Sequence, residues 1–249
     1  MFQFAPIGVV HSCFREKFGI PRQPGLVPAA RATLELLPPY NQPATVRGLE
    51  GFSHLWLLFV FHGVPAGRWR ATVRPPRLGG NQRLGVFATR STFRPNPIGL
   101  TVVKLDHIAV RRGQVALHLA GVDLLDGTPV LDIKPYLPYA DRIVEAVGGF
   151  AAEAPEARLA VEFSPAASEF CAAWPGGGDL RELIDQILRQ DPRPAYERTD
   201  PTPRLHGMKL HNLNVRWEAR DGVARVIEIA SVGEHSTALR RRERDGISQ

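Results

Sequence analysis

The chain has 249 residues, of which 44% are hydrophobic and 22% charged, a composition that fits a globular protein and excludes a disordered tail, a collagen or a coiled coil. No apolar run approaches the roughly 18 residues of a membrane helix. Residues 1–10 also lack the basic and apolar regions of a secretory leader. We therefore expect a cytoplasmic protein with no membrane partner. The two cysteines, Cys13 and Cys171, are too few for a structural zinc site or a disulfide framework, and no metal is expected.

Positive charge is concentrated in the first part of the chain. Residues 1–147 carry 17 Lys and Arg against 9 Asp and Glu, whereas residues 148–249 carry 14 against 16. Between Glu50 and Asp106 there are eight basic residues and no acidic one. Such a stretch attracts polyanions, of which nucleic acid is the commonest large one in a cytoplasm, although a solvated basic face would have the same composition.

Short apolar or alternating runs predict strands in the first part of the chain. Clusters of Pro, Gly and Asn separate these runs as turns. Strands this short, with almost no amphipathic helix between them, favour a barrel or sandwich over a parallel doubly wound sheet. The run at 55–61 could also begin a helix. The predicted strands are 4–10, 33–36, 55–61, 84–87, 100–105 and 115–119.

A second unit begins where the composition changes near Gly148. It combines a strand at 158–163 with two helices and two further alternating runs that meet at Asp221-Gly222, a hairpin signal. We expect a mainly β chain with a barrel-like domain at 1–147, a small α+β domain at 148–232 and a frayed basic tail at 233–249. The predicted helices are 165–174 and 179–190, and the alternating runs are 208–217 and 223–229.

Standard nucleotide, zinc and redox motifs are absent: the chain has no G-x-G-x-x-G, no P-loop, no H-E-x-x-H and no C-x-x-C. Loops rich in Pro, Gly and Arg remain, at 21–25, 74–81, 88–99 and 123–129. Proline fixes φ and glycine permits close backbone approach, so these loops have defined shapes and are suited to hold ligands.

These loops carry a family resemblance. The segments RPPRLGGN (74–81), GVFATRS (85–91), RPNPIG (94–99), DLLDGTP (123–129) and DIKPY (132–136) occur in this order. The chain resembles the TsaA-like, or TrmO, family of tRNA methyltransferases, and residues 191–196 with 214–217 resemble the C-terminal domain of its bacterial long form. The resemblance implies a single-sheet β-barrel that works as a homodimer, uses S-adenosylmethionine, and methylates N6 of N6-threonylcarbamoyladenosine beside the anticodon of tRNA.

The resemblance also implies a cofactor site. An arginine can hold the carboxylate of S-adenosylmethionine, while carboxylates and aromatic rings can hold its ammonium and sulfonium groups. Ordinary structural roles compete with these assignments, since Phe61 could belong to the core and Arg90 could brace a loop. The residues assigned to the cofactor are Pro21, Arg22, Gln23, Phe61, His62, Arg90, Leu100, Asp123, Leu124, Leu125, Asp126 and Gly127.

The expected acceptor is a urea nitrogen, whose lone pair is drawn into the carbonyl and the purine. A base would help to remove its proton, and among strand-end candidates we assign this catalytic role to Asp132 and Tyr136. Asp132 could instead form a local ion pair with Lys134. The residues assigned to the tRNA substrate are Tyr40 and Asn41 for the base edge, Arg77 and Arg83 for phosphates, and Arg94, Asn96 and Lys134 for the threonyl group and its loop.

Two functions of other classes stay open from the sequence. One is a non-enzymatic β-barrel module that binds S-adenosylmethionine or RNA. The other is a hydrolase acting on a small anionic substrate, for which no nucleophile and base pair is visible. Binding of the methyl donor would argue against the hydrolase, and methyl transfer would argue against the module.

Overall fold

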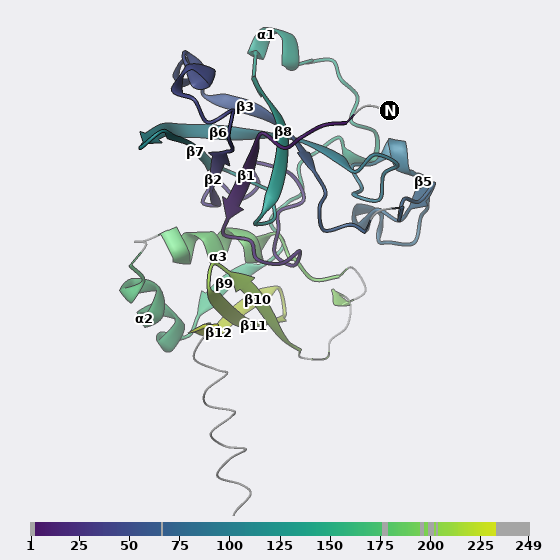
Figure 1. The fold of residues 1–249 in the computed structure, drawn as a ribbon. Helices are drawn as coiled ribbons and strands as arrows, with labels where there is room; N and C mark the ends of the chain where they lie inside the picture. The colour runs from purple at the N-terminus through teal and green to yellow at the C-terminus, as the bar shows by residue number, and fades with distance from the viewer. Residues whose placement is uncertain are drawn as a thin grey trace, which may run out of the picture.

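The structure is a computed structural model that describes residues 3–65, 67–175, 179–194, 197–198, 202 and 204–232. Its first part is a closed barrel of six strands, which confirms the predicted mainly β class (Figure 1). Every neighbouring pair in the barrel is antiparallel. In order around the barrel the strands are β1 (Gly8–Ser12), β2 (Arg31–Leu36), β7 (Gln114–Ala120), β6 (Ile98–Arg111), β3 (His54–Val60) and β8 (Thr128–Pro135).

Alternation along each strand separates the barrel interior from its outer face. On β3, Leu55, Leu57 and Phe59 are buried, while the residues between them are partly exposed. A strand points successive side chains to opposite faces, so this period of two fills the closed barrel with aliphatic side chains. The run at 55–61 is thus a strand and not the beginning of a helix.

One strand prediction in the barrel region was wrong, and one barrel strand was missed. The run at 84–87 is a two-residue strand, β5 (Leu84–Gly85), followed by a 3-10 turn at Val86–Ala88, and it lies outside the barrel. Among the described residues it pairs with one strand, the equally short β4 (Thr72–Val73), and the ladder spans two residues of each. The sixth barrel strand is instead β8, which the sequence did not predict.

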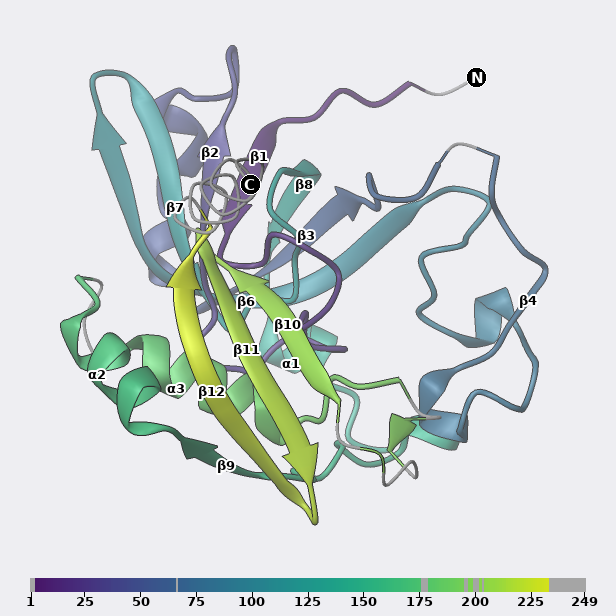
Figure 2. The ribbon, with the colours of Figure 1, turned by 90° about the horizontal axis from the view of Figure 1, so that it is seen from below.

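A long excursion, residues 61–97, leaves the barrel between β3 and β6. It contains β4, β5 and 3-10 turns at Pro76–Leu78 and Val86–Ala88. Figures 1 and 2 show it as a separate lobe at the side of the barrel. Because β3 and β6 pair along their whole contact, from His54↔Lys104 to Val60↔Ile98, the two ends of the excursion lie at the same end of the barrel.

The C-terminal part is a four-stranded sheet with two helices, as Figure 2 shows. The predicted turn at Asp221-Gly222 joins two of its strands. The run at 208–217 is not one strand, because the chain reverses at His211 and Asn212. The backbone N–H of His211 donates to the carbonyl of Cys13 at 2.7 Å, so a contact with the barrel domain holds this turn. In sheet order the strands are β10 (Leu205–Leu210), β11 (Leu213–Arg220), β12 (Val223–Ser231) and β9 (Ala160–Phe163), and the helices are α2 (Pro165–Ala173) and α3 (Asp179–Arg189).

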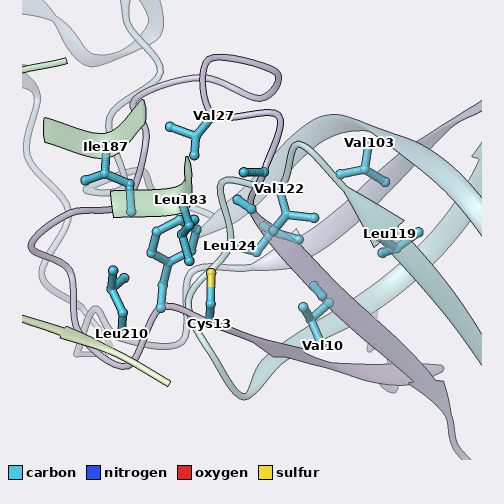
Figure 3. Close-up of a cluster of buried hydrophobic side chains, with 14 of the residues drawn as sticks. Val10, Cys13, Val27, Val103, Leu119, Val122, Leu124, Leu183, Ile187 and Leu210 are labelled. Atoms are coloured by element: carbon cyan, nitrogen blue, oxygen red, sulfur yellow. The ribbon is translucent and has the colours of Figure 1, made fainter. Parts of the chain in front are cut away.

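One hydrophobic core joins the two parts. Figure 3 shows barrel residues such as Val10 and Val103 continuing through Cys13 and Val27 to Leu183 and Ile187 of α3. The backbone N–H of Ala29 also donates to Oε1 of Gln186 on α3 at 2.9 Å. The connection from β8 to β9 runs through a short helix, α1 (Pro138–Asp141), and a 3-10 turn at Gly149–Ala151. The domain boundary near residue 148 stays a prediction, and the tail at 233–249 lies outside the described residues.

Candidate functional site

A cavity of about 500 Å³ lies at the end of the barrel where the excursion leaves and returns. This volume is within the range of sites for small ligands and cofactors. Four chain regions converge on it: the loop before β2, the end of β3, the returning part of the excursion with the beginning of β6, and the loop after β7. The side chains on its walls are mixed, with aromatic, aliphatic, cationic and carboxylate groups. Its principal lining residues are Pro21, Arg22, Gln23, Trp56, Phe59, Phe61, His62, Thr89, Arg90, Arg94, Leu100, Asp123, Leu124 and Leu125.

Asp123 supplies the carboxylate of the cavity. The hydroxyl of Thr101, on β6, donates to Oδ1 of Asp123 at 2.7 Å. Among the described residues, no second residue donates a hydrogen bond to this carboxylate, although the backbone N–H of Asp123 itself does. Burial raises the pKa of Asp123, and the hydrogen bond from Thr101 and the positive charge of Arg90 oppose this rise. A carboxylate in this position gains from a cationic ligand group, because such a group would compensate for its lost hydration.

Arg90 and Gln23 are far apart in the sequence but meet on one wall of the cavity. The Arg90 guanidinium donates to Oε1 of Gln23 through a short hydrogen bond. Arg22, the neighbour of Gln23, lies close to the C-terminal domain. Partial burial lowers the pKa of Arg22, with the nearby charges of Arg198 and Arg158 as further causes. The cavity therefore places guanidinium groups near one carboxylate, an arrangement suited to a ligand that carries both signs of charge.

The aromatic wall depends on a glycine. A Cβ atom at Gly99 would lie 2.2 Å from Cζ of Phe59, so only glycine leaves room for this ring. Phe59 packs edge to face against Phe61, with ring centroids 5.1 Å apart. The neighbouring residue Gly63 is held in place by Lys17, whose Nζ donates to the Gly63 carbonyl at 2.7 Å. These contacts fix the rings at the end of β3.

Ten of the twelve residues predicted for the cofactor line this cavity; the other two, Asp126 and Gly127, do not. Oδ1 of Asp126 accepts from the backbone N–H of Ser12 at 3.0 Å, and its other oxygen pairs with Arg15. The N–H of Gly127, at φ +77°, donates to the carbonyl of Val10 at 2.8 Å. Both residues thus hold the turn before β8, and a role in cofactor binding stays a prediction.

The residues predicted for the substrate are dispersed. Of these, Arg94 alone lines the cavity. Tyr40 and Asn41 lie elsewhere: Nδ2 of Asn41 donates to Gln114, at the beginning of β7, whereas Asp123 follows the end of that strand. In one chain the length of β7 therefore separates them from the cavity.

The other predicted substrate residues sit on the excursion and on β8. Arg77 donates to the carbonyl of Glu153, and Nη1 of Arg83 donates to Thr72 at 3.1 Å. Asn96 is exposed just before β6. Their roles in binding stay predictions.

The pair proposed for catalysis lies on the outer face of the barrel. Oδ2 of Asp132 is 2.8 Å from Nζ of Lys134, so the two form the local ion pair that the sequence left open. The Tyr136 ring lies 5.9 Å from that of Trp56, which is itself a cavity residue. Trp56, like Thr101 and Phe59, was missed by sequence reasoning. No local motif marks these three residues, because strand pairing alone brings them to the site.

The arginines of the excursion lack carboxylate partners. In the described part of the chain, no Asp or Glu forms an ion pair with any of the seven arginine side chains of the excursion, which are listed below. Arg94 instead donates through Nη1 to the carbonyls of Val86 and Thr89, at 3.2 and 2.8 Å. The excursion thus carries an excess of positive charge, as a surface for a polyanion would. The seven residues are Arg68, Arg70, Arg74, Arg77, Arg83, Arg90 and Arg94.

A buried ion cluster lies in the C-terminal domain near Arg22. Asp191 is 2% exposed and pairs with Nε of Arg193 at 2.8 Å and with Nε of Arg198 at 3.3 Å. Within the described ranges, no group of three His, Cys, Asp or Glu residues could hold a metal ion. Nor is any helix in those ranges long and apolar enough to span a membrane.

A closed antiparallel barrel with a charged and aromatic cavity at one end, beside an arginine-rich lobe, defines a class of protein that is suited to a small zwitterionic ligand next to a polyanion. The tRNA-methyltransferase O N-terminal domain matches residues 9–142, and the TrmO C-terminal domain matches residues 156–232. The chain belongs to the TrmO family, which confirms the resemblance seen in its sequence.

Individual relatives agree with this assignment. The chain is 52% identical over 221 residues to the tRNA (adenine(37)-N6)-methyltransferase of Escherichia coli, covering 88% of this chain and 94% of that protein. It is 38% identical over 141 residues, 57% of this chain and 71% of the relative, to a probable S-adenosyl-L-methionine-binding protein of Pyrococcus abyssi. The crystal structure of TrmO from Pseudomonas aeruginosa superposes with a TM-score of 0.75 at 46% identity, covering 93% of this chain and 99% of that one.

Proposed function

We propose that this chain is an S-adenosylmethionine-dependent tRNA methyltransferase that methylates N6 of N6-threonylcarbamoyladenosine beside the anticodon. Membership of the TrmO family supports the reaction class. The structural observation that carries the proposal is the partly buried carboxylate of Asp123, to which Thr101 alone of the other described residues donates, in a cavity bordered by arginines without carboxylate ion-pair partners in the described ranges.

The cavity residues fit S-adenosylmethionine, which supplies an electrophilic methyl group when it is bound. The carboxylate of Asp123 would hold its ammonium group, and Arg90 or Arg22 would hold its carboxylate. The rings of Phe59 and Phe61 offer apolar faces for the adenine or the sulfonium. Holding the donor rigidly against the acceptor contributes to the rate through orientation, which in well-oriented systems amounts to roughly 7–11 kcal/mol.

The acceptor nitrogen must lose a proton, and Asp132 and Tyr136 remain our candidates for the base. Asp132 lies on the outer face of β8, and Tyr136 follows that strand directly, with its ring beside Trp56 at the cavity wall. The ion pair with Lys134 holds the Asp132 carboxylate in place. Tyr136 can orient the acceptor base through its hydroxyl.

Recognition of the threonyl carboxylate is assigned to Arg94 in preference to Lys134. Arg94 lines the cavity and is braced through Nη1 alone, so its Nε and Nη2 groups are available for a bidentate carboxylate contact among the described residues. Lys134 is already paired with Asp132. A substrate without the threonylcarbamoyl group would leave the Arg94 guanidinium without its anion.

We further propose that the enzyme is a homodimer in the cytoplasm, where its tRNA substrate is found. Ile98 and Leu100 are 40% and 54% exposed on the outer face of β6, next to the partly exposed Trp56 of β3. An exposed apolar strip of this kind is suited to a second copy of the chain. The same contact would bring a partner's residues to the edge of the cavity.

Mass spectrometry of tRNA nucleosides tests the reaction. tRNA that carries N6-threonylcarbamoyladenosine but lacks its methyl group is incubated with the protein and S-adenosylmethionine, and we expect the nucleoside to gain one methyl group. Asp123→Asn should abolish this gain, while Asp221→Asn, in the exposed β11–β12 turn, serves as the matched control. Cofactor binding without methyl transfer would favour the non-enzymatic module, and the absence of cofactor binding would favour the hydrolase.

A further inference from the structure

We infer that Trp69, Phe87 and Phe93 form a stacking surface for unpaired bases of the RNA on either side of the methylated nucleotide. The inference rests on the proposed function for the identity of the RNA. It concerns a binding surface outside the cavity, built from residues that neither the cofactor nor the acceptor requires. We call these three side chains the aromatic platform.

The aromatic platform is exposed to an extent that folding does not explain. Trp69 is 53%, Phe87 76% and Phe93 36% exposed. They are also the only large hydrophobic side chains exposed in the described part of the excursion. All three are aromatic. Large apolar groups gathered on a surface generally mark a binding site.

Backbone contacts bring the platform residues together although they are far apart in sequence. The N–H of Arg70 donates to the carbonyl of Phe93 at 3.1 Å, which places Trp69 next to the loop segment that carries Phe93. The N–H of Val86 donates to Ala71 at 2.9 Å, which brings the Phe87 turn to the same segment. The three side chains thus belong to one compact lobe, which Figure 2 shows projecting from the barrel.

Arginines are interleaved with the aromatic rings. The guanidinium of Arg70 lies 5.7 Å from the Phe93 ring centroid, and that of Arg94 lies 5.7 Å from the Phe87 ring centroid. A partner with flat apolar faces and a charged backbone satisfies both kinds of group, and single-stranded RNA has both. An apolar protein surface would cover the rings but leave the arginines without anions. Charge complementarity therefore favours RNA as the occupant.

The platform lies beside the entrance of the cavity. Arg94 and Thr89 line the cavity, and Phe87 and Phe93 are near neighbours of these residues in the sequence. An enzyme that modifies a base in a loop takes that base out of its stack, and the flanking bases then lose a neighbour. Phe87 and Phe93 would replace it with a ring, and so lower the cost of drawing the target base into the cavity.

Binding of anticodon stem-loop RNA to the full chain tests the inference. We expect Phe87→Ala to weaken RNA binding about tenfold, in the range that loss of one stacked base gives. The slope of log affinity against log salt should not change, because no phosphate contact is lost. Phe87→Trp should restore binding. Binding of S-adenosylmethionine should stay as in the original protein, which shows that the cavity is intact.

Tyr139→Ala is the matched control, since Tyr139 is 87% exposed on α1, outside the excursion. A second measurement uses the fluorescence of Trp69, which RNA should quench, and this change should disappear in Trp69→Phe.

Unchanged RNA affinity in Phe87→Ala and Phe93→Ala would overturn the inference. A loss of the dimer in these variants, with RNA affinity unchanged at equal oligomeric state, would also overturn it and assign the rings to a protein contact. Should the protein bind RNA through the platform but transfer no methyl group, the inference would hold and the proposed function would fail.

Discussion

The hydroxyl of Thr101 donates to the carboxylate of Asp123 at 2.7 Å, from β6 to the loop that follows β7. This contact orients the one carboxylate of the cavity without neutralising it. Thr101 is itself 2% exposed and supports Asp123, which lines the cavity, from behind. Substitutions at this pair should therefore change the binding of a cationic ligand group and the stability of the ligand-free protein in opposite directions.

Asp123→Asn should stabilise the ligand-free protein and weaken binding of S-adenosylmethionine. Burial raises the pKa of Asp123 above its unfolded value, so the charged carboxylate is disfavoured in the folded state. Its favourable contribution to stability is present at low pH and is lost as pH rises through the folded pKa. We expect a melting temperature a few degrees higher at neutral pH and an affinity at least tenfold lower, about 1.4 kcal/mol. Thermal denaturation and titration calorimetry measure both. A variant that loses stability and keeps its affinity would contradict this assignment.

Thr101→Val should move the pH dependence of cofactor binding upward. In the original protein, the hydrogen bond from Thr101 lowers the pKa of Asp123. Its removal in the variant lets this pKa rise further. Affinity for the ammonium group requires the ionised carboxylate. As the pH is lowered, the affinity of the variant should therefore begin to fall at a higher pH than that of the original protein. Calorimetric titrations over a pH series measure this shift. Thr101→Ser retains the hydroxyl and should keep the original profile.

Gly99→Ala should disrupt the aromatic wall. The new Cβ would lie 2.2 Å from the Phe59 ring, which would have to leave its contact with Phe61. Overpacking of this kind costs about 1–3 kcal/mol. We expect a lower free energy of unfolding in urea and weaker cofactor binding. Gly85→Ala is the control, because a Cβ at Gly85 has no heavy atom within 4 Å.

Cys13 should be inert in the folded protein. Burial raises the pKa of its thiol to about 12, so almost no thiolate is present at neutral pH. Burial also raises the pKa of Cys171, by a smaller amount. A thiol reagent should modify neither cysteine rapidly in the native protein and both after denaturation. Rapid modification of Cys13 in the native state would show that the core around it opens.

Arg83→Ala should reduce the salt dependence of tRNA binding by about one unit of slope if this side chain contacts a phosphate. Arg83 has a hydroxyl partner, Thr72, and its charge is not paired with a described carboxylate. Arg225→Ala is the matched control, since Arg225 pairs with Glu162 at 3.0 Å in the C-terminal sheet. Filter binding at several salt concentrations measures the slopes, and equal slopes in the two variants would make the excursion an ordinary solvated surface.

Sequence patterns predicted the cavity loops better than they predicted its walls. Arg90 and Asp123 belong to local motifs rich in Pro, Gly and charge, which are visible without a fold. Phe59 and Thr101 reach the cavity only through the pairing of β3 with β6, where Leu57 is opposite Thr101. Such register is a property of the closed sheet, and no local pattern encodes it.

The prediction of strands from the sequence was limited for the same reason. β8 begins with a threonine and a proline and ends with a proline, so its sequence resembles a turn region, yet it closes the barrel between β1 and β3. Tyr40 and Asn41 were assigned to the substrate by their residue types. Their distance from the cavity follows from the direction of β7, which the sequence does not contain as a local signal.

The core that continues from Val103 in the barrel to Ile187 in α3 makes the covalent link between the two domains largely redundant. Separated halves would each expose the apolar side chains that they now bury against one another. A single proteolytic cut between α1 and β9 would leave the two fragments associated. Heat or denaturant should accordingly melt the barrel and the C-terminal sheet in one transition, since loss of either removes the other's packing partner.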